Sequence, residues 1–252
     1  MDFDVEYLKR RYLEQGKSIQ HLADEFGISS KLMYYYLHKY GLAVKGTTST
    51  TKVDDSKFNF LDPIFCYYAG LVITDGHLDE KNNRVSLRVC NDGSYEVLKR
   101  LRRHFKASSN VRVYGSSNDL TIHSRTLLEV LSQAGISGPK NTRLFFVPFI
   151  ENLPEQNQRM FFRGILDGDG NIHNSRFRIA MKSQGMIEAI VDFVNHLLGS
   201  KYSMSYGTNS SKMLYPKLEM RKGDSLEFLD WLYIGYKYYR FEDKFQVFLL
   251  SK

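Results

Sequence analysis

An internal repeat constrains the fold of this 252-residue chain more than any other feature. Residues 66–78 read CYYAGLVITDGHL and residues 161–173 read FFRGILDGDGNIH, so each segment is an apolar run that ends in Asp-Gly. The aligned segments share two glycines and an aspartate, namely Gly70 with Gly164, Asp75 with Asp169, and Gly76 with Gly170. Such self-similarity predicts two halves with the same internal structure.

After each apolar run, apolar residues alternate with basic or polar ones. NRVSLRVCNDGSYE (83–96) lies over SRFRIAMKSQGMIE (175–188), and this period of two is typical of a half-buried strand. The expected inward residues are Val85, Leu87 and Val89 in the first half and Phe177, Ile179 and Met181 in the second. Further elements are expected as helices near 94–106 and 186–198, strands near 110–114, 119–123, 202–206 and 214–221, and a final helix in each half. The fold class is therefore α+β with antiparallel sheets.

The acidic residues that end the two apolar runs point to a metal site. Gly70 and Gly164 lie inside the expected helices, where glycine costs roughly 1 kcal/mol relative to alanine, so a close approach of the two helices is the expected reason for them. Helices that pack through these glycines would bring Asp75 and Asp169 together at their carboxyl ends. There the two carboxylates repel each other and oppose the helix dipoles, and a divalent cation reverses both penalties.

Oxygen ligands of this kind suit Mg²⁺, or Mn²⁺ in its place. The candidate ligand groups are Asp75, Asp169 and the backbone at Gly76 and Gly170. Each of these glycines would also let the chain turn sharply and keep the site open to a phosphate. The alternative is that each Asp-Gly is an ordinary turn that ends a helix. Two copies at matching places in a repeat favour the metal site.

Residues 1–45 are helical in period and are expected to form a separate module, followed by a small, polar linker over residues 46–57. Ser29 or Ser30 can cap the second helix of a pair that Gly27 separates. The expected inward residues are Val5, Leu8, Tyr12 and Leu13, then Ile19, Leu22 and Ala23, and finally Leu32, Met33, Leu37 and Tyr40. This pattern favours a helix-turn-helix over an ordinary helical hairpin. In the DNA-binding form, the second helix would present Ser30, Lys31, Tyr34, Tyr35 and His38.

The composition excludes several protein classes. Hydrophobic residues make up 42% of the chain and aromatic residues 14%, which indicates a folded globular protein. The net charge of +7 favours a polyanionic partner, nucleic acid first. Cys66 and Cys90 are the only cysteines, so we expect reduced thiols in an intracellular protein. No apolar run approaches the roughly 20 residues of a membrane span, so no membrane partner is expected.

The two nine-residue segments from Tyr68 and Phe162 resemble the LAGLIDADG motif of homing endonucleases, and the similarity covers essentially residues 58–252. This resemblance implies two αββαββα halves, residues 58–150 and 151–252, whose sheets form a saddle over the DNA major groove. It also implies a monomeric, site-specific endonuclease that cuts both strands of double-stranded DNA, with no protein partner, in the cytoplasm or nucleoid of a bacterial or phage-infected cell or in an organelle. The acidic metal ligand of the motif falls on Asp75 and Asp169. The sixth motif position is Asp167 in the second copy and Ile73 in the first, so the chemistry is not expected to depend on Asp167.

In this family, basic residues lie around the catalytic centre. The resemblance carries this position to Lys140 in GPKNTRLFFVP and to Lys244 in YYRFEDKFQVF. Lys182, at the end of a strand, is a third candidate, and its counterpart in the first half is Cys90. Such a lysine would polarise water or stabilise the charged phosphate in the transition state.

DNA reading is expected from the outward strand positions, since arginine can bridge O6 and N7 of guanine. The candidates are Arg84, Arg88, Arg112, His123, Arg176, Arg178, Lys217 and Arg221. The basic run KRLRRHFK (99–106) is expected instead on a helix behind the sheet. Two alternatives stay open: a non-cleaving nucleic-acid binder, either a transcription regulator or an intron-splicing maturase, and a strand-specific nickase. The presence of both acids favours the nuclease, whereas Ile73 and Cys90 make the first half the less regular one.

Overall fold

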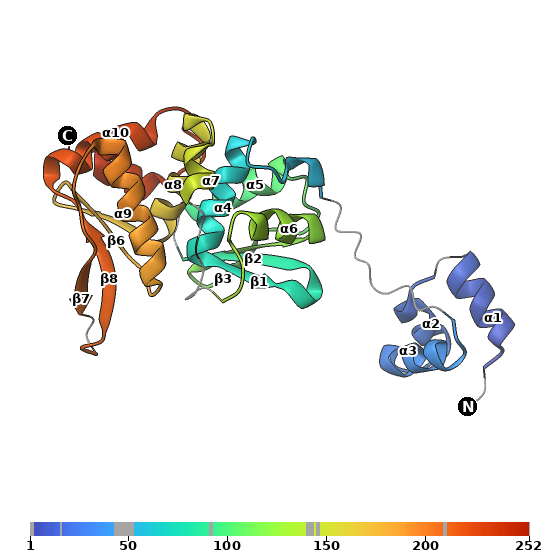
Figure 1. Ribbon diagram of the computed structural model, residues 1–252. Coiled ribbons are helices and arrows are strands. Elements are labelled where there is room, and N and C mark those ends of the chain that lie inside the picture. Colours follow the sequence, from blue (N-terminus) through green and yellow to red (C-terminus); the bar gives the residue numbers. More distant parts are fainter. Residues whose placement is uncertain are drawn as a thin grey trace. The chain divides into compact units, whose positions relative to one another are not determined.

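The computed structural model describes residues 3–15, 17–42, 53–90, 93–139, 144, 147–208 and 211–251. The chain folds as two compact units, Met1–Thr50 and Thr51–Lys252 (Figure 1). The first unit is helical, and the second holds the two sheets and the helices that pack on them.

The first unit is built around a small apolar core. Its elements are α1 (Val5–Lys9), the π-helix η1 (Arg10–Glu14), α2 (Ile19–Glu25) and α3 (Ser30–Lys39). Leu8, Leu22, Met33 and Leu37 are fully buried, as expected. Leu32 was expected in the core as well, and this expectation is wrong, because its side chain is 40% exposed.

The turn between α2 and α3 has the local chemistry that the sequence predicted. Gly27 has a φ of +64°, a left-handed conformation that glycine adopts without steric cost. The Ser29 hydroxyl accepts the backbone N–H of Leu32 at 3.3 Å, so Ser29 rather than Ser30 caps α3. α2 and α3 are thus two helices joined by a short glycine turn.

The second unit contains the repeat as two copies of one topology. The first half comprises α4 (Pro63–Asp75), β1 (Gly76–Asp79), β2 (Arg84–Val89), α5 (Ser94–His104), β3 (Arg112–Tyr114), β4 (Ser117–His123) and α6 (Arg125–Gln133). The second half comprises α8 (Glu155–Asp169), β5 (Gly170–His173), β6 (Arg176–Ala180), α9 (Gln184–Leu198), β7 (Ser205–Thr208), β8 (Leu214–Glu219) and α10 (Lys222–Tyr233). Short helices also occur: η2 (Asp55–Lys57), η3 (Glu80–Asn82), α7 (Val147–Glu151) and α11 (Glu242–Leu249). The expected order of helix, two strands, helix, two strands, helix is confirmed.

Each half contributes one four-stranded antiparallel sheet, in the orders β1-β2-β4-β3 and β5-β6-β8-β7. The inner faces pack against α5 and α6 in the first half and against α9 and α10 in the second (Figure 1). The residues expected to point inward are buried, namely Val85, Leu87, Val89, Phe177 and Ile179, while Met181 is partly buried. Because side chains alternate along a strand, the basic residues between them lie on the opposite, outer face.

α4 and α8 pack side by side at the centre of the second unit (Figure 1). A Cβ built on Gly70 would lie 2.1 Å from the Phe161 carbonyl oxygen. One built on Gly164 would lie 2.2 Å from the Tyr67 carbonyl oxygen. Each distance is far below van der Waals contact, so only glycine allows the two backbones to come this close. The close helix approach predicted from the paired glycines is confirmed.

Two segments differ from the sequence-based expectation. Residues 53–57, expected in the linker, pack on the first half of the sheet unit. The Asp54 backbone N–H donates to the Phe105 carbonyl at 2.8 Å, and the Ser124 hydroxyl donates to Asp55 at 2.7 Å. Beyond α10, the chain continues into α11, which the repeat pattern did not predict and which packs on β5.

Candidate functional site

α4 and α8 end in the same way, at the two aspartates of the repeat. The backbone N–H of Gly76 donates to the Val72 carbonyl, and that of Gly170 donates to the Leu166 carbonyl. Each glycine then begins a strand, with extended dihedral angles that any residue can adopt. Glycine is required for another reason, because a Cβ on Gly76 would lie 2.5 Å from the Val72 carbonyl oxygen and one on Gly170 2.6 Å from that of Leu166. The sequence predicted glycine here for a sharp turn. The structure shows instead that a side chain would clash with the preceding turn of the helix.

The helix pair brings the two acidic ends together. A Cβ built on Gly168, the residue before Asp169, would lie 2.8 Å from the Asp75 Oδ2 atom. It would also overlap the hydroxyl of Thr74, which is the counterpart of Gly168 in the first half. Both aspartates are partly exposed. The juxtaposition of Asp75 with the end of α8, expected from the sequence, is therefore present.

Lys244 projects from α11 onto the carboxyl end of α8. Its Nζ atom donates to the carbonyl oxygens of Asp167 at 2.5 Å, Leu166 and Gly170 at 2.8 Å, and Gly168 at 3.3 Å. Burial lowers the pKa of this ammonium group, and the carboxylates of Asp167, Asp243, Asp75 and Asp169 oppose that shift. Lys244 thus satisfies the last carbonyls of α8 and offsets the negative end of its dipole.

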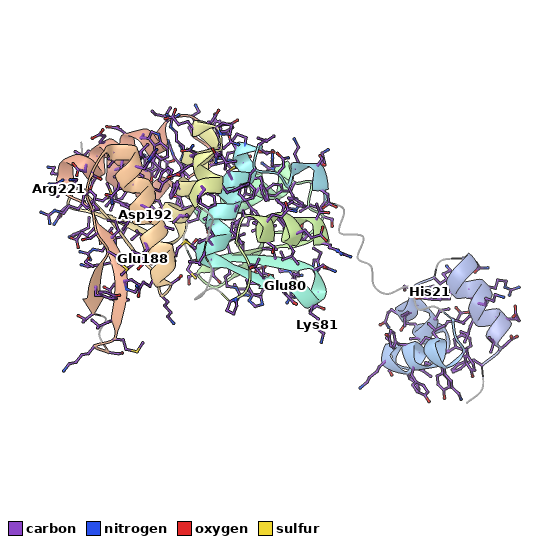
Figure 2. The ribbon with its side chains drawn as sticks, viewed as in Figure 1. His21, Glu80, Lys81, Glu188, Asp192 and Arg221 are labelled. Atoms are coloured by element: carbon purple, nitrogen blue, oxygen red, sulfur yellow. The ribbon has the colours of Figure 1, made fainter. Side chains whose placement is uncertain are left out.

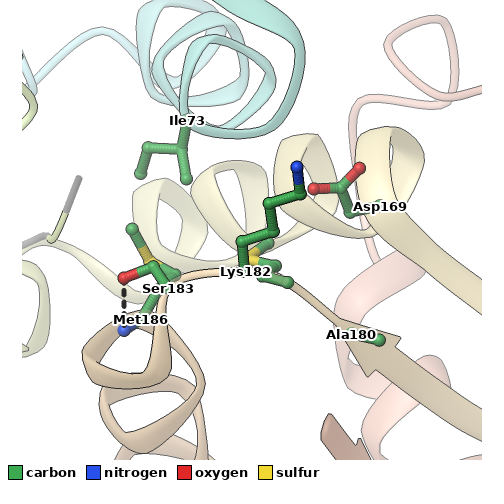
Figure 3. Close-up of a pocket in the computed structure, with 7 residues that line it drawn as sticks. Ile73, Asp169, Ala180, Lys182, Ser183 and Met186 are labelled. Atoms are coloured by element: carbon green, nitrogen blue, oxygen red, sulfur yellow. Dashed lines mark hydrogen bonds between the residues drawn. The ribbon is translucent and has the colours of Figure 1, made fainter. Parts of the chain in front are cut away.

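Lys182 lies beside the second acid. Ile73, Asp169, Lys182 and Ser183 line one pocket of about 500 Å³, and Figure 3 shows the Lys182 amine directed toward the Asp169 carboxylate. At the equivalent position the first half has Cys90, which is exposed. Lys140 lies outside the described residues. The two acids therefore have chemically different surroundings, as the sequence indicated.

Asp167 is more deeply integrated than its mismatch with Ile73 suggested. Its side chain is 1% exposed, and its Oδ2 atom accepts the Tyr67 hydroxyl at 2.7 Å and the Phe241 backbone N–H at 2.8 Å. Burial raises the pKa of this carboxyl to about 7, against the opposing hydrogen bond from Tyr67 and the nearby charge of Lys244. The repeat alignment gave Asp167 no importance because its counterpart is Ile73. Its contacts with Tyr67 and Phe241 are not visible in the sequence.

The outer face of the first sheet gathers four predicted DNA-contact residues. A hollow on this face is lined by Arg84, Arg88 and Arg112, and Asp75 also lines it. His123 is exposed on the same face, opposite Arg84 in the strand register. Two of the arginines also form ion pairs on the sheet, Arg84 with Asp79 at 2.7 Å and Arg88 with Asp119 at 3.6 Å. An acidic side chain therefore lies beside each of these two arginines.

The outer face of the second sheet carries the corresponding set. Arg176 and Arg178 line a hollow together with His173 and Glu219. Glu219 lies 3.3 Å from Arg178 and 3.0 Å from Lys217, so one carboxylate joins both cations. Arg221, labelled in Figure 2, directly precedes α10 and pairs with Asp224 in the first turn of that helix at 3.1 Å. It was expected on a strand, and this expectation is wrong, because β8 ends at Glu219.

The helices that cover the sheets carry other charge patterns. The basic run 99–106 begins on α5, which packs against β4 as expected, and ends just after that helix. Two of its cations contact other parts of the same unit: Arg100 donates to the Tyr238 carbonyl at 2.6 Å, and Lys106 pairs with Asp54 at 2.9 Å. α9 presents the exposed acids Glu188 and Asp192, labelled in Figure 2. Within the described residues, no helix has the length and apolarity that spanning a membrane would require.

In the first unit, α3 presents the residues that the sequence assigned to its outer face. Lys31 is exposed, and Tyr34 and Tyr35 are 48% and 59% exposed. Ser30 is only partly exposed, and its hydroxyl donates to the Gln20 side chain. The His38 side chain lies outside the described part of the chain. α3 thus displays a basic and aromatic surface.

No protein-family model and no curated protein matches this chain. Solved structures are similar to it. I-DmoI in complex with DNA and Mn has a TM-score of 0.51 at 18% identity, over 71% of this chain and 99% of that one. Full-length DUF199/WhiA from Thermatoga maritima has a TM-score of 0.50 at 13% identity, over 80% of this chain and 67% of that one. The N-terminal LAGLIDADG domain of DUF199/WhiA has a TM-score of 0.50 at 13% identity, over 71% and 87% of the two chains. At such identities the likeness establishes architecture, and this chain has the two-half LAGLIDADG fold.

Proposed function

We propose that this chain is a site-specific endonuclease that hydrolyses phosphodiester bonds in both strands of double-stranded DNA, with Mg²⁺ or Mn²⁺. The observation that carries the proposal is the meeting of Asp75 with the α8 end that bears Asp169, beside two sheets with arginine on their outer faces. The neighbour I-DmoI, described as a homing endonuclease and solved with DNA and Mn, supports it. One chain supplies both halves, so the enzyme would act as a monomer.

The side chains at this site fit a hard divalent cation. Mg²⁺ is commonly held by one or two carboxylates, with waters and substrate phosphates completing its coordination. Among the described residues, no three His, Cys, Asp or Glu side chains gather in a group that could hold a metal, so a cation bound by Asp75 and Asp169 would need waters and substrate phosphates as its remaining ligands. When bound, such a cation supplies an activated water and stabilises charge on the phosphate. Because the Gly170 carbonyl accepts from Lys244, we assign the metal to the carboxylates rather than to this carbonyl.

The remaining residues would bind and orient the DNA. The arginines of the two outer faces would contact phosphates and guanine edges of the duplex. Lys182, beside Asp169, would stabilise negative charge on the phosphate in the second half. Lys244 would hold the end of α8, and with it Asp169, in place. Lys140 would take the equivalent basic position in the first half.

A second candidate function is binding without cleavage of both strands. Structural likeness to WhiA as well as to I-DmoI leaves a non-cleaving regulator or maturase as one form of it. The exposed Cys90 and the apolar Ile73, where the second half has Lys182 and Asp167, favour strand-specific nicking as the other. The presence of both acids favours the endonuclease, since a pure binder gains nothing from two close carboxylates.

Selection of cleaved sites from a random plasmid library tests the proposed function. In Mg²⁺ we expect enrichment of one non-palindromic sequence, because the two outer faces carry different residues. Omission of the metal should abolish enrichment. Tight DNA binding without a cut at any site would support the non-cleaving binder, and a cut in one strand alone would support the nickase.

The first unit is proposed to be an accessory DNA anchor that uses the outer face of α3. The triple variant Lys31→Ala/Tyr34→Ala/Tyr35→Ala should shorten the nuclease footprint at one end and weaken binding roughly 10-fold or more, because a basic and aromatic contact surface is lost. Cleavage at saturating enzyme should persist. The control Glu6→Ala/Lys9→Ala alters exposed residues of α1 and should leave the footprint unchanged. A full-length footprint in the triple variant would remove the anchoring role.

A further inference from the structure

Arg163 joins α8 to the end of α10 through an unusual set of bonds. Its side chain is fully buried, although buried arginines are rare unless all their donors are satisfied. Nε and Nη2 donate to the Leu232 carbonyl at 3.1 and 2.5 Å, and Nη2 also donates to that of Ile234 at 3.0 Å. Nη1 donates to the carbonyls of Gly235 and Tyr236 at 3.3 and 3.1 Å. One side chain thus holds the carbonyl groups where α10 ends.

Asp167, one helical turn further along α8, holds the start of α11. It accepts the backbone N–H of Phe241, the residue that precedes α11, at 2.8 Å. Lys244 lies in the first turn of α11 and returns to the last carbonyls of α8. Arg163, Asp167 and Lys244 therefore form three successive connections between α8 and residues 232–244. We refer to these three residues as the α8 latch.

Two of the three latch residues have no polar counterpart in the first half. In the repeat alignment, Ala69 stands where the second half has Arg163, and Ile73 stands where it has Asp167. Neither apolar side chain can hold a backbone carbonyl or N–H group. Both are buried, so the first half has packing at the positions where the second has hydrogen bonds. Since the halves otherwise share one topology, the latch is a built-in difference between two related sites.

We propose that Arg163 and Asp167 are positioning residues that fix Lys244 at the end of α8, so that the acid of the second half is supported by two side chains whose counterparts in the first half, Ala69 and Ile73, are apolar. This inference rests on the proposed endonuclease function and deepens it, because it predicts that the two strands depend on different residues. Asp167 touches neither substrate nor Asp169 in this scheme. It acts through α11, whose first turn carries Lys244.

Strand-resolved cleavage tests the proposal on the full chain. With each strand of the selected site end-labelled, Asp167→Leu, which keeps the bulk of the side chain and removes the acceptor of the Phe241 N–H, should slow one strand about 10- to 100-fold and the other less than about 3-fold, as expected for loss of a supporting residue. Lys244→Met should slow the same strand. The double variant should be no slower than Lys244→Met alone, because both changes break one connection. Equal slowing of both strands, opposite strand preferences or additive effects would each overturn the proposal.

Ser225→Ala serves as the matched structural control. Ser225 is fully buried in the second half and accepts the Phe177 backbone N–H at 2.9 Å, without contacting residues 232–244. This variant should lower stability and leave the ratio of the two strand rates unchanged. A strand bias in Ser225→Ala as large as that in Asp167→Leu would show that general destabilisation causes the effect, and it would reject the positioning role.

A measurement without DNA separates this inference from the proposed function. Acetylation of Lys244 by acetic anhydride, read by mass spectrometry, should be about fivefold faster in Asp167→Leu than in the unmodified chain, because loss of the Phe241 contact releases α11 and exposes the amine. Lys182, which is outside the latch, should react at an unchanged rate. An unchanged rate at Lys244 would overturn the proposal. If the unmodified chain cuts no DNA while Lys244 reacts faster in the variant, the endonuclease assignment fails and the latch stands.

Discussion

Asp75→Asn and Asp169→Asn are each expected to reduce cleavage in Mg²⁺ by roughly 100-fold or more, which exceeds the effect of losing a single supporting residue around a metal. Asparagine keeps the size of the side chain and its carbonyl oxygen and removes the negative charge that holds a divalent cation. DNA affinity should change little, since the arginines of the outer faces remain. The measurements are single-turnover rates for each strand of the selected site, together with a binding titration.

Asp192→Asn is the matched control, because it removes one carboxylate from the exposed face of α9, away from the acid pair. It should cut at the rate of the unmodified chain. If Asp75→Asn and Asp169→Asn also cut at that rate, the assignment of these residues as metal ligands is wrong. If one variant loses one strand and the other variant loses the other, each acid serves the cut nearest to it.

Gly164→Ala is expected to lower the free energy of unfolding by roughly 2 kcal/mol or more, as overpacking against a rigid neighbour does. The new methyl group would lie 2.2 Å from the Tyr67 carbonyl oxygen, which is backbone and cannot move aside. Gly70→Ala should behave in the same way, since its Cβ would lie 2.1 Å from the Phe161 carbonyl oxygen. Each expected loss already includes a gain of about 1 kcal/mol, because alanine favours the helix more than glycine does. Urea unfolding followed by circular dichroism gives the midpoints.

Gly223→Ala is the control for propensity alone. Gly223 lies in the first turn of α10, and a Cβ there meets nothing within 4 Å. Its unfolding midpoint should equal or exceed that of the unmodified chain. If Gly164→Ala unfolds at the same urea concentration as Gly223→Ala, the close packing of α4 on α8 is not what these glycines serve. Cleavage should fall in Gly164→Ala at temperatures where it remains folded, because separated helices carry the two acids apart.

The repeat and the strand alternation predicted most of the fold. The paired glycines predicted the packing of α4 on α8, because a costly residue inside a helix needs a compensating close approach. The alternation predicted that Val85 and Leu87 are buried and that Arg84 and Arg88 lie outward, because successive side chains of a strand point to opposite faces of the sheet. These inferences succeeded since each depends on residues that are neighbours along the chain or on a direct comparison of the two copies.

The site was predicted less completely. The sequence paired Asp75 with Asp169 and contrasted Lys182 with Cys90. It treated Asp167 as unimportant, although this side chain is buried between the two halves and joins Tyr67 to the start of α11. It also predicted that Gly76 and Gly170 form sharp turns. Their backbone is extended, and glycine is needed because a Cβ would clash with a carbonyl oxygen of the preceding helical turn. Neither local pattern nor the repeat carries this information.

The sequence by itself determined the two-half architecture, the pairing of its two acidic helix ends and the outward faces of its strands. The tertiary structure alone decided that Lys244 is held on the α8 carbonyls and that Arg163 holds the end of α10. These contacts join residues 69 and 77 positions apart, and the Lys244 contacts involve α11, which packs on β5 after the repeat has ended. The periodicity of apolar residues predicts which face of a helix or strand is buried. The partner of a buried charge depends instead on which distant element packs against it.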